Sequence, residues 1–276
     1  MATILSHQGV SITPDALESF VYLPEREGSL QAEIVAAIRQ HNMIAMELTP
    51  DLDTLILEVA AGNPVLVLQN LGNAWLPRWH YAVVVGYDLN RKQFVLRSGT
   101  HKRWVTDFSV FDRTWQRGQR WGLVALPAGR MPVTAQPMNY LKAASALEAT
   151  GLTQAAYEAY KSAVIRWPEN LIALMGLGNA AYTLKDYSAS ERAFRDATQH
   201  HPLNPATWNN LAYALAQQGC REEAETAASC AAKLSPADTI HNRTLDEIRN
   251  LSSPKSAQQC APVDCPAKAN KALRKE

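Results

Sequence analysis

The stretch "PRWHYAVVVGYD" at residues 77–88 places a titratable ring just before a run of apolar residues. An imidazole titrates near neutral pH, so His80 has the chemistry to accept a proton from a nucleophile. The run Ala82–Val85 is apolar enough to form a strand that is buried on both faces. A histidine at the start of such a strand can also simply hydrogen-bond to a backbone carbonyl. A catalytic role therefore requires a nucleophile that can reach the ring.

The cysteines do not supply that nucleophile in an obvious way. All four, Cys220, Cys230, Cys260 and Cys265, lie in the C-terminal quarter of the chain. None has the paired C-x-x-C spacing of a zinc site, and we predict neither a metal nor a cofactor. Disulfides remain open as an alternative. For Cys260 and Cys265 we expect exposed thiols in a flexible segment.

The elements that must position His80 change character along the chain. Thr13-Pro14 and Thr49-Pro50 each combine an N-cap hydroxyl with a proline at the first helical position, and Ser29 is expected to cap a third helix that Asn42 ends. After residue 62, short runs rich in β-branched residues predict strands at 65–69, 80–87, 93–97, 103–107 and 121–126. Helices followed by strands favour an α+β domain with an antiparallel sheet. We expect this domain at residues 1–126 and a linker at 127–136.

After the linker the sequence becomes alanine-rich, with a repeat period of 34 residues that Pro168, Pro202 and Pro236 mark. Aligned on these prolines, small residues and large rings recur at fixed positions: Tyr140, Leu174 and Trp208; Ala144, Gly178 and Ala212; Tyr160, Phe194 and Ala228; Ala163, Ala197 and Ala231. Small residues let two helices of a hairpin approach, and large rings fill the gap between them. This pattern resembles the tetratricopeptide repeat and predicts an all-α superhelix of three repeats plus a capping helix at 137–251. The polar tail at 252–276 is expected to be disordered.

The first 126 residues carry a second resemblance. The pieces "YLPEREGSLQAEIVAAIRQHN", "AGNPVLVLQN" and "WHYAVVVGYD" together resemble the double-glycine-leader (bacteriocin-processing) cysteine peptidases, a bacterial family of papain-like fold. In such enzymes a histidine that opens a central strand takes the proton of a cysteine at the start of an N-terminal helix. The helix dipole and the imidazolium lower the pKa of that thiol. The resemblance implies a thiol peptidase fold with His80 as general base.

The family's cysteine is not in the printed sequence. By the resemblance it would fall shortly before Met1, so we expect either a start that is assigned too late or a pseudo-enzyme. We favour the late start, because a fold does not normally begin midway through a core helix. In either case the 276-residue chain itself is expected to be inactive as a thiol peptidase.

The third member of the catalytic group also departs from the family, in which an aspartate orients the histidine. A tight hairpin centred on Leu89-Asn90 places Ser98-Gly99 opposite His80, where no carboxylate is present. Ser98 is able to orient the ring weakly through its hydroxyl, and Asp107 or Asp112 could reach it from a loop. Asp88 is too far along the same strand.

Two surfaces are candidates for binding a polypeptide. Trp75, Trp79 and Gln69 are expected to line a substrate groove, although the two tryptophans could instead pack the edge of the sheet. On the concave face of the repeats, a polar and aromatic set suits the backbone amides of a peptide, although it could also only solvate the groove: Asn179, Tyr182, Asn209, Asn210 and Tyr213.

Two functions from different classes follow. The first is a cysteine peptidase whose repeats recruit a protein substrate. The second is a non-catalytic adaptor in which a peptidase-like domain and repeats bind proteins or peptides.

The composition limits partners and location. The net charge of +1 argues against a large nucleic-acid-binding surface. No apolar run approaches the roughly 18 residues that span a bilayer, and the N-terminus lacks the basic start and apolar core of a secretory signal. The chain as printed is expected in the cytoplasm, or in the cell envelope if an export signal precedes it. The oligomeric state is left open.

Overall fold

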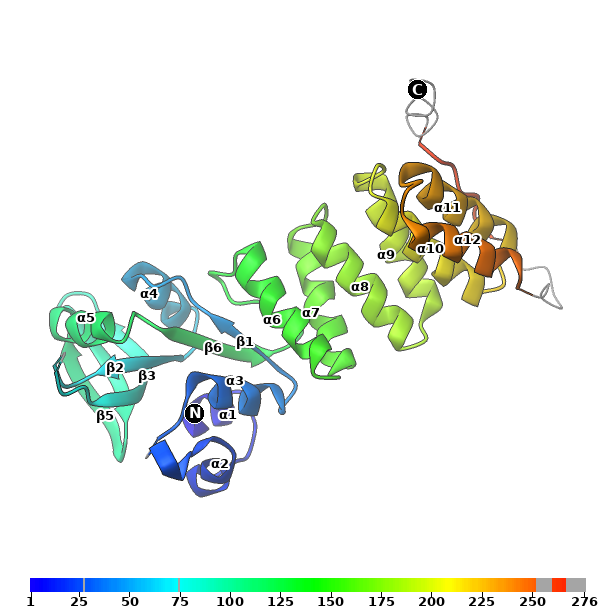
Figure 1. Ribbon diagram of the computed structural model, residues 1–276. Helices are drawn as coiled ribbons and strands as arrows, with labels where there is room; N and C mark the ends of the chain where they lie inside the picture. Colours follow the sequence, from blue (N-terminus) through cyan, green and yellow to red (C-terminus); the bar gives the residue numbers. More distant parts are fainter. Residues whose placement is uncertain (27, 74, 252–259, 267–276) are drawn as a thin grey trace. The chain divides into compact units, whose positions relative to one another are not determined.

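The computed structural model describes residues 1–26, 28–73, 75–251 and 260–266 (Figure 1). The chain divides into two compact units, Met1–Ala155 and Ala156–Glu276. None of the described helices is long and apolar enough to cross a membrane.

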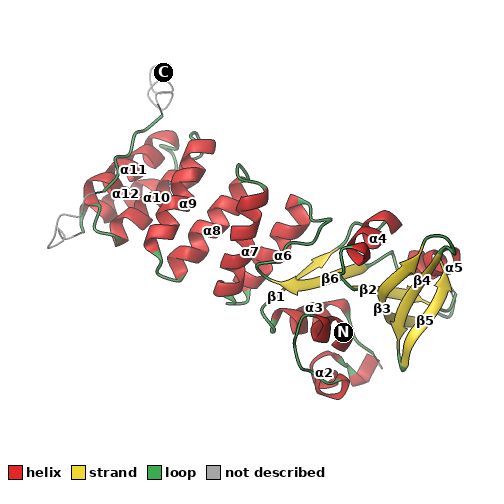
Figure 2. Cartoon of the chain, turned by 180° about the vertical axis from the view of Figure 1, so that it is seen from behind, coloured by secondary structure: helices red, strands yellow, loops and turns green. Residues whose placement is uncertain are grey.

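The first unit is an α+β domain, as the sequence predicts. Its helices are α1 (Ala2–His7), α2 (Pro14–Val21), a 3-10 turn (Pro24–Arg26), α3 (Gln31–Arg39), α4 (Leu52–Ala60) and α5 (Phe108–Arg117), with α6 (Pro137–Ala149) at its end. Its strands are β1 (Met43–Glu47), β2 (Val65–Asn70), β3 (Trp79–Asp88), β4 (Gln93–Ser98), β5 (His101–Asp107) and β6 (Gly122–Pro127). Figure 2 shows these strands as one sheet, with α1, α2 and α3 gathered on the same side of it.

The predicted helix starts are correct for α2 and wrong in detail for the other two. The hydroxyl of Thr13 accepts a hydrogen bond from the amide of Ala16 and caps α2. The cap of α4 is Asp51, not Thr49, because the helix begins at Leu52 and the Asp51 carboxylate accepts a 2.6 Å hydrogen bond from the amide of Thr54. Leu30, not Ser29, occupies the cap position of α3, where no side chain forms a capping hydrogen bond.

The sheet is antiparallel and its strands lie in the order β1-β6-β2-β3-β4-β5. Four of the five predicted strands, β2 to β5, pair in sequence order, whereas the fifth, β6, pairs with β2 and β1 and not with β5. The structure adds two elements that the sequence does not predict, β1 and α5. Strand β1 is buried over four of its five residues and pairs with β6, so its partner lies about eighty positions away in sequence (Ile44 with Leu126). A short apolar run next to a helix cannot be distinguished from its continuation by periodicity alone.

The register between β3 and β4 differs from the predicted one. Ala82, and not His80, lies opposite Ser98. A shift between Val84 and Gly86 changes the pairing further toward the turn. The turn between Asp88 and Gln93 is centred on Asn90-Arg91, one residue later than predicted, and the bulge compensates for only part of this offset.

The expected linker packs firmly against the first unit. Glu58 of α4 is fully buried and accepts hydrogen bonds from Thr134, through its amide at 2.7 Å and its hydroxyl at 2.6 Å. The second carboxylate oxygen of Glu58 accepts a 2.6 Å hydrogen bond from the side chain of Asn63. One carboxylate thus joins α4, the Gly62-Asn63-Pro64 turn and the segment before α6.

The second unit is a row of helices that agrees with the predicted repeats: α7 (Thr153–Arg166), α8 (Leu171–Thr183), α9 (Tyr187–His200), α10 (Pro205–Gln217), α11 (Arg221–Leu234) and α12 (Thr239–Arg249). The small residues Gly178, Ala197, Ala212 and Ala231 are all buried. A Cβ on Gly178 would lie 2.4 Å from the ring of Phe194, so this position requires glycine for the close approach of α8 and α9.

The capping helix forms as predicted, with one difference. Ile248 is buried, and Leu245 packs against the same core. Ile240 and Leu251, which have the same helical spacing, are about half exposed. Helix α12 therefore covers the last repeat through a narrower apolar face than the sequence predicts.

The expectation of exposed thiols at Cys260 and Cys265 is wrong. Cys260 is bonded to Cys220, and Cys265 is bonded to Cys230, with Cα–Cα distances of 5.8 and 5.6 Å. Both disulfides fasten the segment 260–266 to the repeat core. The expectation of disorder for 252–259 and 267–276 lies outside the described residues.

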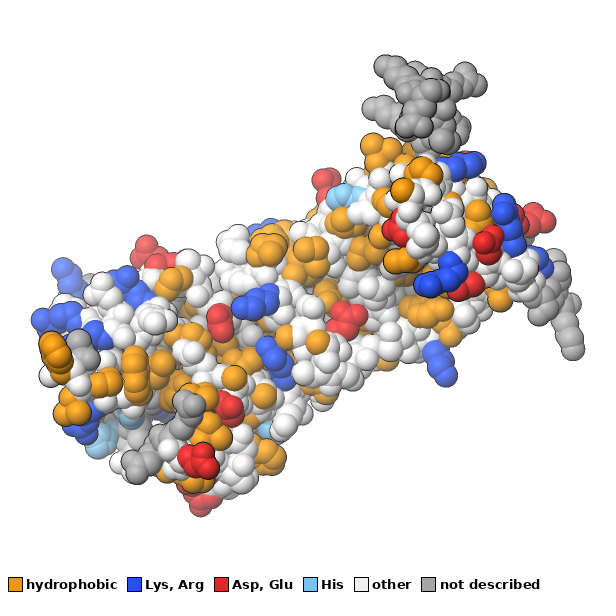
Figure 3. Space-filling view, in the orientation of Figure 1, with side chains coloured by type: hydrophobic (Ala, Val, Ile, Leu, Met, Phe, Trp, Pro, Cys, Tyr) orange, Lys and Arg blue, Asp and Glu red, His pale blue; other side chains and the backbone are white. Residues whose placement is uncertain are grey.

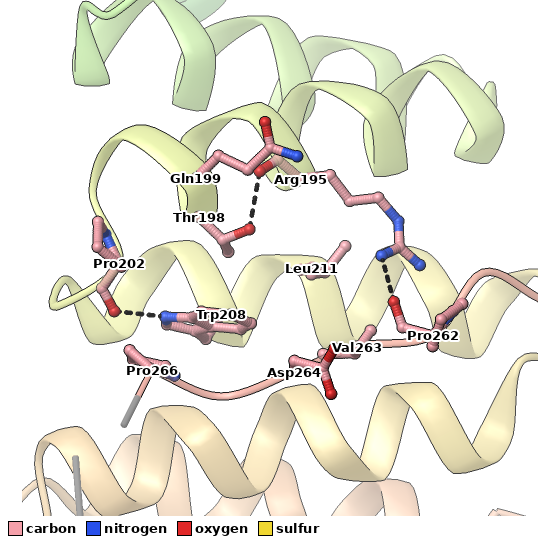
Figure 4. A pocket seen from close by; sticks show the side chains of 10 residues that line it. All are labelled: Arg195, Thr198, Gln199, Pro202, Trp208, Leu211, Pro262, Val263, Asp264 and Pro266. Carbon is pink, nitrogen blue, oxygen red and sulfur yellow. Dashed lines mark hydrogen bonds between the residues drawn. The ribbon is translucent and has the colours of Figure 1, made fainter. Parts of the chain in front are cut away.

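Figure 4 shows how side chains hold this segment against α9 and α10. The guanidinium of Arg195 donates hydrogen bonds to the carbonyl oxygens of Pro262 at 3.0 Å and Ala261 at 2.6 Å. Sequence periodicity cannot detect such contacts, because the segment has no regular secondary structure of its own.

Candidate functional site

The most distinctive polar contact on the sheet involves His80. Its Nε2 atom lies 2.7 Å from the hydroxyl oxygen of Ser98. The ring is half-buried near the start of β3, and this burial lowers the pKa of His80 below its ordinary value of 6.5. A lowered pKa keeps the imidazole neutral at neutral pH, which is the form that accepts a proton.

The structure decides among the side chains that could orient this ring. Asp88 caps the turn through the amide of Arg91, and Asp107 accepts a hydrogen bond from the side chain of Gln93. Asp112 forms a bidentate ion pair with Arg120 at 3.0 and 3.2 Å. Of these candidates, Ser98 is the one whose side chain contacts the ring of His80.

Helix α1 lies beside the strands that carry this pair. Ile4 and Leu5 pack in one core cluster with Val83, and Met1 lines the same hollow as Tyr81 and Gly99, the neighbours of His80 and Ser98. The N-terminal end of α1 thus lies at the end of the sheet where β3 begins.

The side chains of β3 divide between the two faces of the sheet. His80 is paired with Gln69 of β2, whose buried amide donates a 2.6 Å hydrogen bond to Thr114 of α5. Adjacent side chains alternate across a strand, so Tyr81 belongs to the opposite face, where α1 packs. His80 therefore lies on the face of the sheet that α5 covers.

The three expected groove residues have different environments. Trp79 is 57% exposed and lines a cleft of about 1050 Å³, together with Gln31 at the start of α3, Arg78 and Tyr81. Gln69 is buried against α5, and Trp75 is 95% exposed and does not line the cleft.

Tyr81 also lines this cleft, although it is not among the candidate residues that the sequence indicates. Burial, aided by the negative charge of Glu33, raises the pKa of Tyr81 to about 12. The phenol therefore stays protonated and can donate a hydrogen bond within the cleft. Because side chains alternate along a strand, Tyr81 and its neighbour His80 lie on opposite faces of the sheet.

On the repeats, four of the five expected residues share one surface. Asn179, Tyr182, Asn210 and Tyr213 surround a hollow of about 270 Å³, with the ring of Phe194 as its remaining lining. The side chain of Asn210 donates to that of Asn179 at 3.1 Å, which joins α10 to α8.

The fifth residue, Asn209, does not line this hollow. It is only 8% exposed, and its side chain contacts His241 of α12. Tyr213 donates a 2.8 Å hydrogen bond to Glu247, which adds an acid from α12 beside the hollow. Glu247 lies beside the hollow because α12 packs against α10, so the sequence alone does not indicate this contact.

Among the described residues, the one grouping with metal-binding spacing consists of Cys220, Glu223 and Cys260. The two sulfur atoms are joined in a disulfide. They do not act as thiolate ligands in this state.

Comparison with known proteins agrees with both parts of this description. Residues 1–121 match the Peptidase C39 like family, and residues 141–191 and 184–239 match the tetratricopeptide repeat. No match was found among curated proteins. The chain thus consists of a peptidase C39-like domain followed by tetratricopeptide repeats.

Solved structures that are similar to part of this chain include two tetratricopeptide domains. One is the first tetratricopeptide domain of Spaghetti (RPAP3) bound to the HSP90 peptide SRMEEVD, at 16% identity over 41% of this chain and 90% of that chain, with a TM-score of 0.39. The other is the Sgt2 tetratricopeptide domain from Aspergillus fumigatus, at 18% identity over 49% of this chain and 93% of that chain, with a TM-score of 0.40.

Proposed function

We propose that this chain binds an extended or helical peptide segment of a partner protein in the hollow between α8 and α10. The observation that carries the proposal is the lining of that hollow. Two amides and two phenols, from Asn179, Asn210, Tyr182 and Tyr213, surround the apolar ring of Phe194. Amides offer both donors and acceptors, which match the alternating groups of a peptide backbone. The Phe194 ring provides an apolar floor for one side chain.

A second candidate function is peptide-bond hydrolysis by a Cys–His mechanism, which is supported by the hydrogen bond between His80 and Ser98. A neutral imidazole can accept the proton of a thiol, after which the thiolate attacks the peptide carbonyl carbon. The imidazolium then gives the proton to the leaving amine, and water hydrolyses the thioester. Ser98 serves to orient the ring during these transfers.

The residues printed here do not provide the nucleophile for that mechanism. All four cysteines are in disulfides of the repeat unit, and residues 1–155 contain no cysteine. We therefore expect the 276-residue chain to act by binding. Hydrolysis requires a further cysteine, and because α1 packs on the face of the sheet opposite His80, a cysteine that precedes Met1 must reach the ring around the end of the sheet where β3 begins.

The two disulfides also support a location. Stable disulfides are typical of secreted and envelope proteins, and rare where thiols are kept reduced. We therefore favour the cell envelope over the cytoplasm for the mature protein. Mass spectrometry of alkylated protein from its native cells tests this. Four unmodified cysteines are expected without reductant, and four alkylated cysteines would contradict the proposal.

The binding proposal is tested with the intact chain and a fluorescent library of unstructured peptides. A peptide selected by the wild type should bind the Asn179→Ala/Asn210→Ala variant at least about tenfold more weakly, because two hydrogen bonds of roughly 1 kcal/mol each are lost. Gln217→Ala, an exposed amide on α10 away from the hollow, is the matched control and should bind like the wild type. Equal affinity of all three proteins would show that another surface recognises the peptide.

Hydrolysis is tested separately with the same library. The 276-residue chain should show no turnover that thiol alkylation removes. If an in-frame extension supplies a cysteine, the extended protein should cleave peptides, and His80→Ala should abolish that cleavage. An active extended His80→Ala variant would exclude this histidine as the base.

A further inference from the structure

The loop between β2 and β3 is held in a defined shape by two asparagine side chains. The Asn70 carboxamide oxygen accepts hydrogen bonds from the amides of Gly72 and Arg78, both at 2.9 Å. The Asn73 oxygen accepts from the amides of Trp75 at 3.0 Å and Leu76 at 2.8 Å. These four hydrogen bonds join the two sides of the loop and fix its described residues.

A glycine is required in this loop. A Cβ on Gly72 would lie 2.1 Å from the carbonyl oxygen of Leu76, which is far inside van der Waals contact. Asn70 itself is only 4% exposed. The loop is therefore anchored at a buried residue and closed tightly at its tip.

This shaped loop exposes apolar side chains instead of burying them. Trp75 is 95% exposed and Leu76 is 72% exposed, and Leu71 is about half exposed. A loop whose sole role is to connect two strands does not require a fixed tip that exposes Trp75 and Leu76. Neither side chain lines the neighbouring cleft, so the tip projects and offers no concave wall to a peptide.

The part of the sequence that contains the tip is rich in positive charge. Residues 70–120 contain nine Lys or Arg and three Asp, a net charge of +6, although residues 1–69 carry nine acids and two bases. Two of the three acids are paired, Asp88 with Arg91 and Asp112 with Arg120. The remaining seven basic residues of this stretch have no ion pair within the described part of the chain.

Several of these cations lie at the same end of the sheet as the tip. Arg78 belongs to the loop, and Arg117 donates a hydrogen bond to the carbonyl of Asn70. His101, paired with Ser98 at the end of β4, leads into Lys102 and Arg103 of the exposed edge strand β5. Figure 3 shows Lys and Arg side chains interspersed with hydrophobic ones around this end of the unit.

We propose that this tip is a peripheral membrane-binding site for a bilayer that contains anionic lipids. Trp75 and Leu76 enter the interfacial region, where tryptophan is favoured because its ring is amphipathic. Arg78, Lys102 and Arg117 contact the lipid phosphates. A projecting apolar tip with cations around it fits a headgroup layer, whereas an acidic polypeptide would require a groove.

The experiment is flotation of the intact 276-residue chain with vesicles of phosphatidylcholine, alone or mixed with phosphatidylglycerol. The wild type should float with the mixed vesicles and much less with phosphatidylcholine alone. Trp75→Ser/Leu76→Ser should weaken binding by roughly tenfold or more, since two large apolar side chains no longer leave water. Ile165→Ser on α7, which alters a side chain that is 78% exposed, is the matched control and should float like the wild type.

Two further measurements distinguish insertion from simple charge attraction. Brominated lipids should quench wild-type tryptophan fluorescence more than that of Trp75→Phe. Arg78→Gln/Lys102→Gln should lose flotation at low salt while keeping its thermal unfolding curve.

Three outcomes would overturn the proposal. They are absence of wild-type flotation on both vesicle types, equal flotation of the tip variant, and Trp75-dependent binding to soluble poly-glutamate without flotation. The last outcome would assign the surface to an acidic polypeptide.

Discussion

The imidazole of His80 and the hydroxyl of Ser98 are joined by a 2.7 Å hydrogen bond between β3 and β4. A hydroxyl carries no negative charge to stabilise an imidazolium. Burial thus acts unopposed, and it lowers the pKa of His80.

This lowered pKa predicts a pH dependence of stability. The unfolded chain binds a proton at His80 more readily than the folded chain does, so stability rises with pH in the window just below 6.5. On acidification from pH 7.5 to 5.5, the wild type should lose more free energy of unfolding than His80→Gln in urea titrations. His101→Gln, which alters an exposed histidine, should behave as the wild type does. Identical pH profiles for all three proteins would show that His80 does not contribute.

Gly178→Ala should destabilise the repeat unit. Alanine is about 1 kcal/mol better than glycine inside a helix. The added Cβ, however, would lie 2.4 Å from the ring of Phe194, and overpacking costs about 1–3 kcal/mol. We expect the clash to dominate and the midpoint of thermal unfolding to fall.

Gln217→Ala, at an exposed position of α10, is the control for helix propensity and should not lower that midpoint. Phe194→Leu combined with Gly178→Ala should cost less than the sum of the two single changes, because the smaller side chain makes room. A stabilising Gly178→Ala would mean that α8 and α9 can move apart freely.

The disulfides should stabilise the repeat unit strongly. Each closes a long loop, with sequence separations of 40 and 35 residues, and such a link contributes roughly 2–4 kcal/mol. Cys220→Ser/Cys260→Ser should therefore lower the midpoint of thermal unfolding. Dithiothreitol should lower it for the wild type and less for this variant. An unchanged midpoint after complete reduction would contradict this prediction.

Glu58 should be essential for joining α4 to the segment before α6. Glu58→Gln replaces one accepting oxygen with a donor that faces the donors of Thr134 or Asn63. A buried polar group without a partner costs about 1–3 kcal/mol. Urea titration should show this loss for Glu58→Gln and almost none for Glu18→Gln, an exposed acid on α2. Equal stability of the two variants would show that the network rearranges.

The sequence by itself predicts the elements whose stabilising partners are near in the chain. The repeats have a fixed period, and the residues that fill each hairpin interface lie within a few helical turns of each other, so their burial follows from spacing. Strands β2 to β5 are also predictable, because a meander pairs neighbours in sequence. The proximity of His80 and Ser98 follows from the same local pairing, although Ala82 is the residue directly opposite Ser98.

Only the tertiary structure decides the features that depend on distant contacts. Strand β1 exists because β6 pairs with it, and Cys260 and Cys265 form disulfides because their segment packs across α9 to α11. The face of the sheet on which His80 lies depends on where α1 and α5 pack. Such contacts join residues far apart in sequence, and their free energy depends on a geometry that no local pattern of side chains encodes.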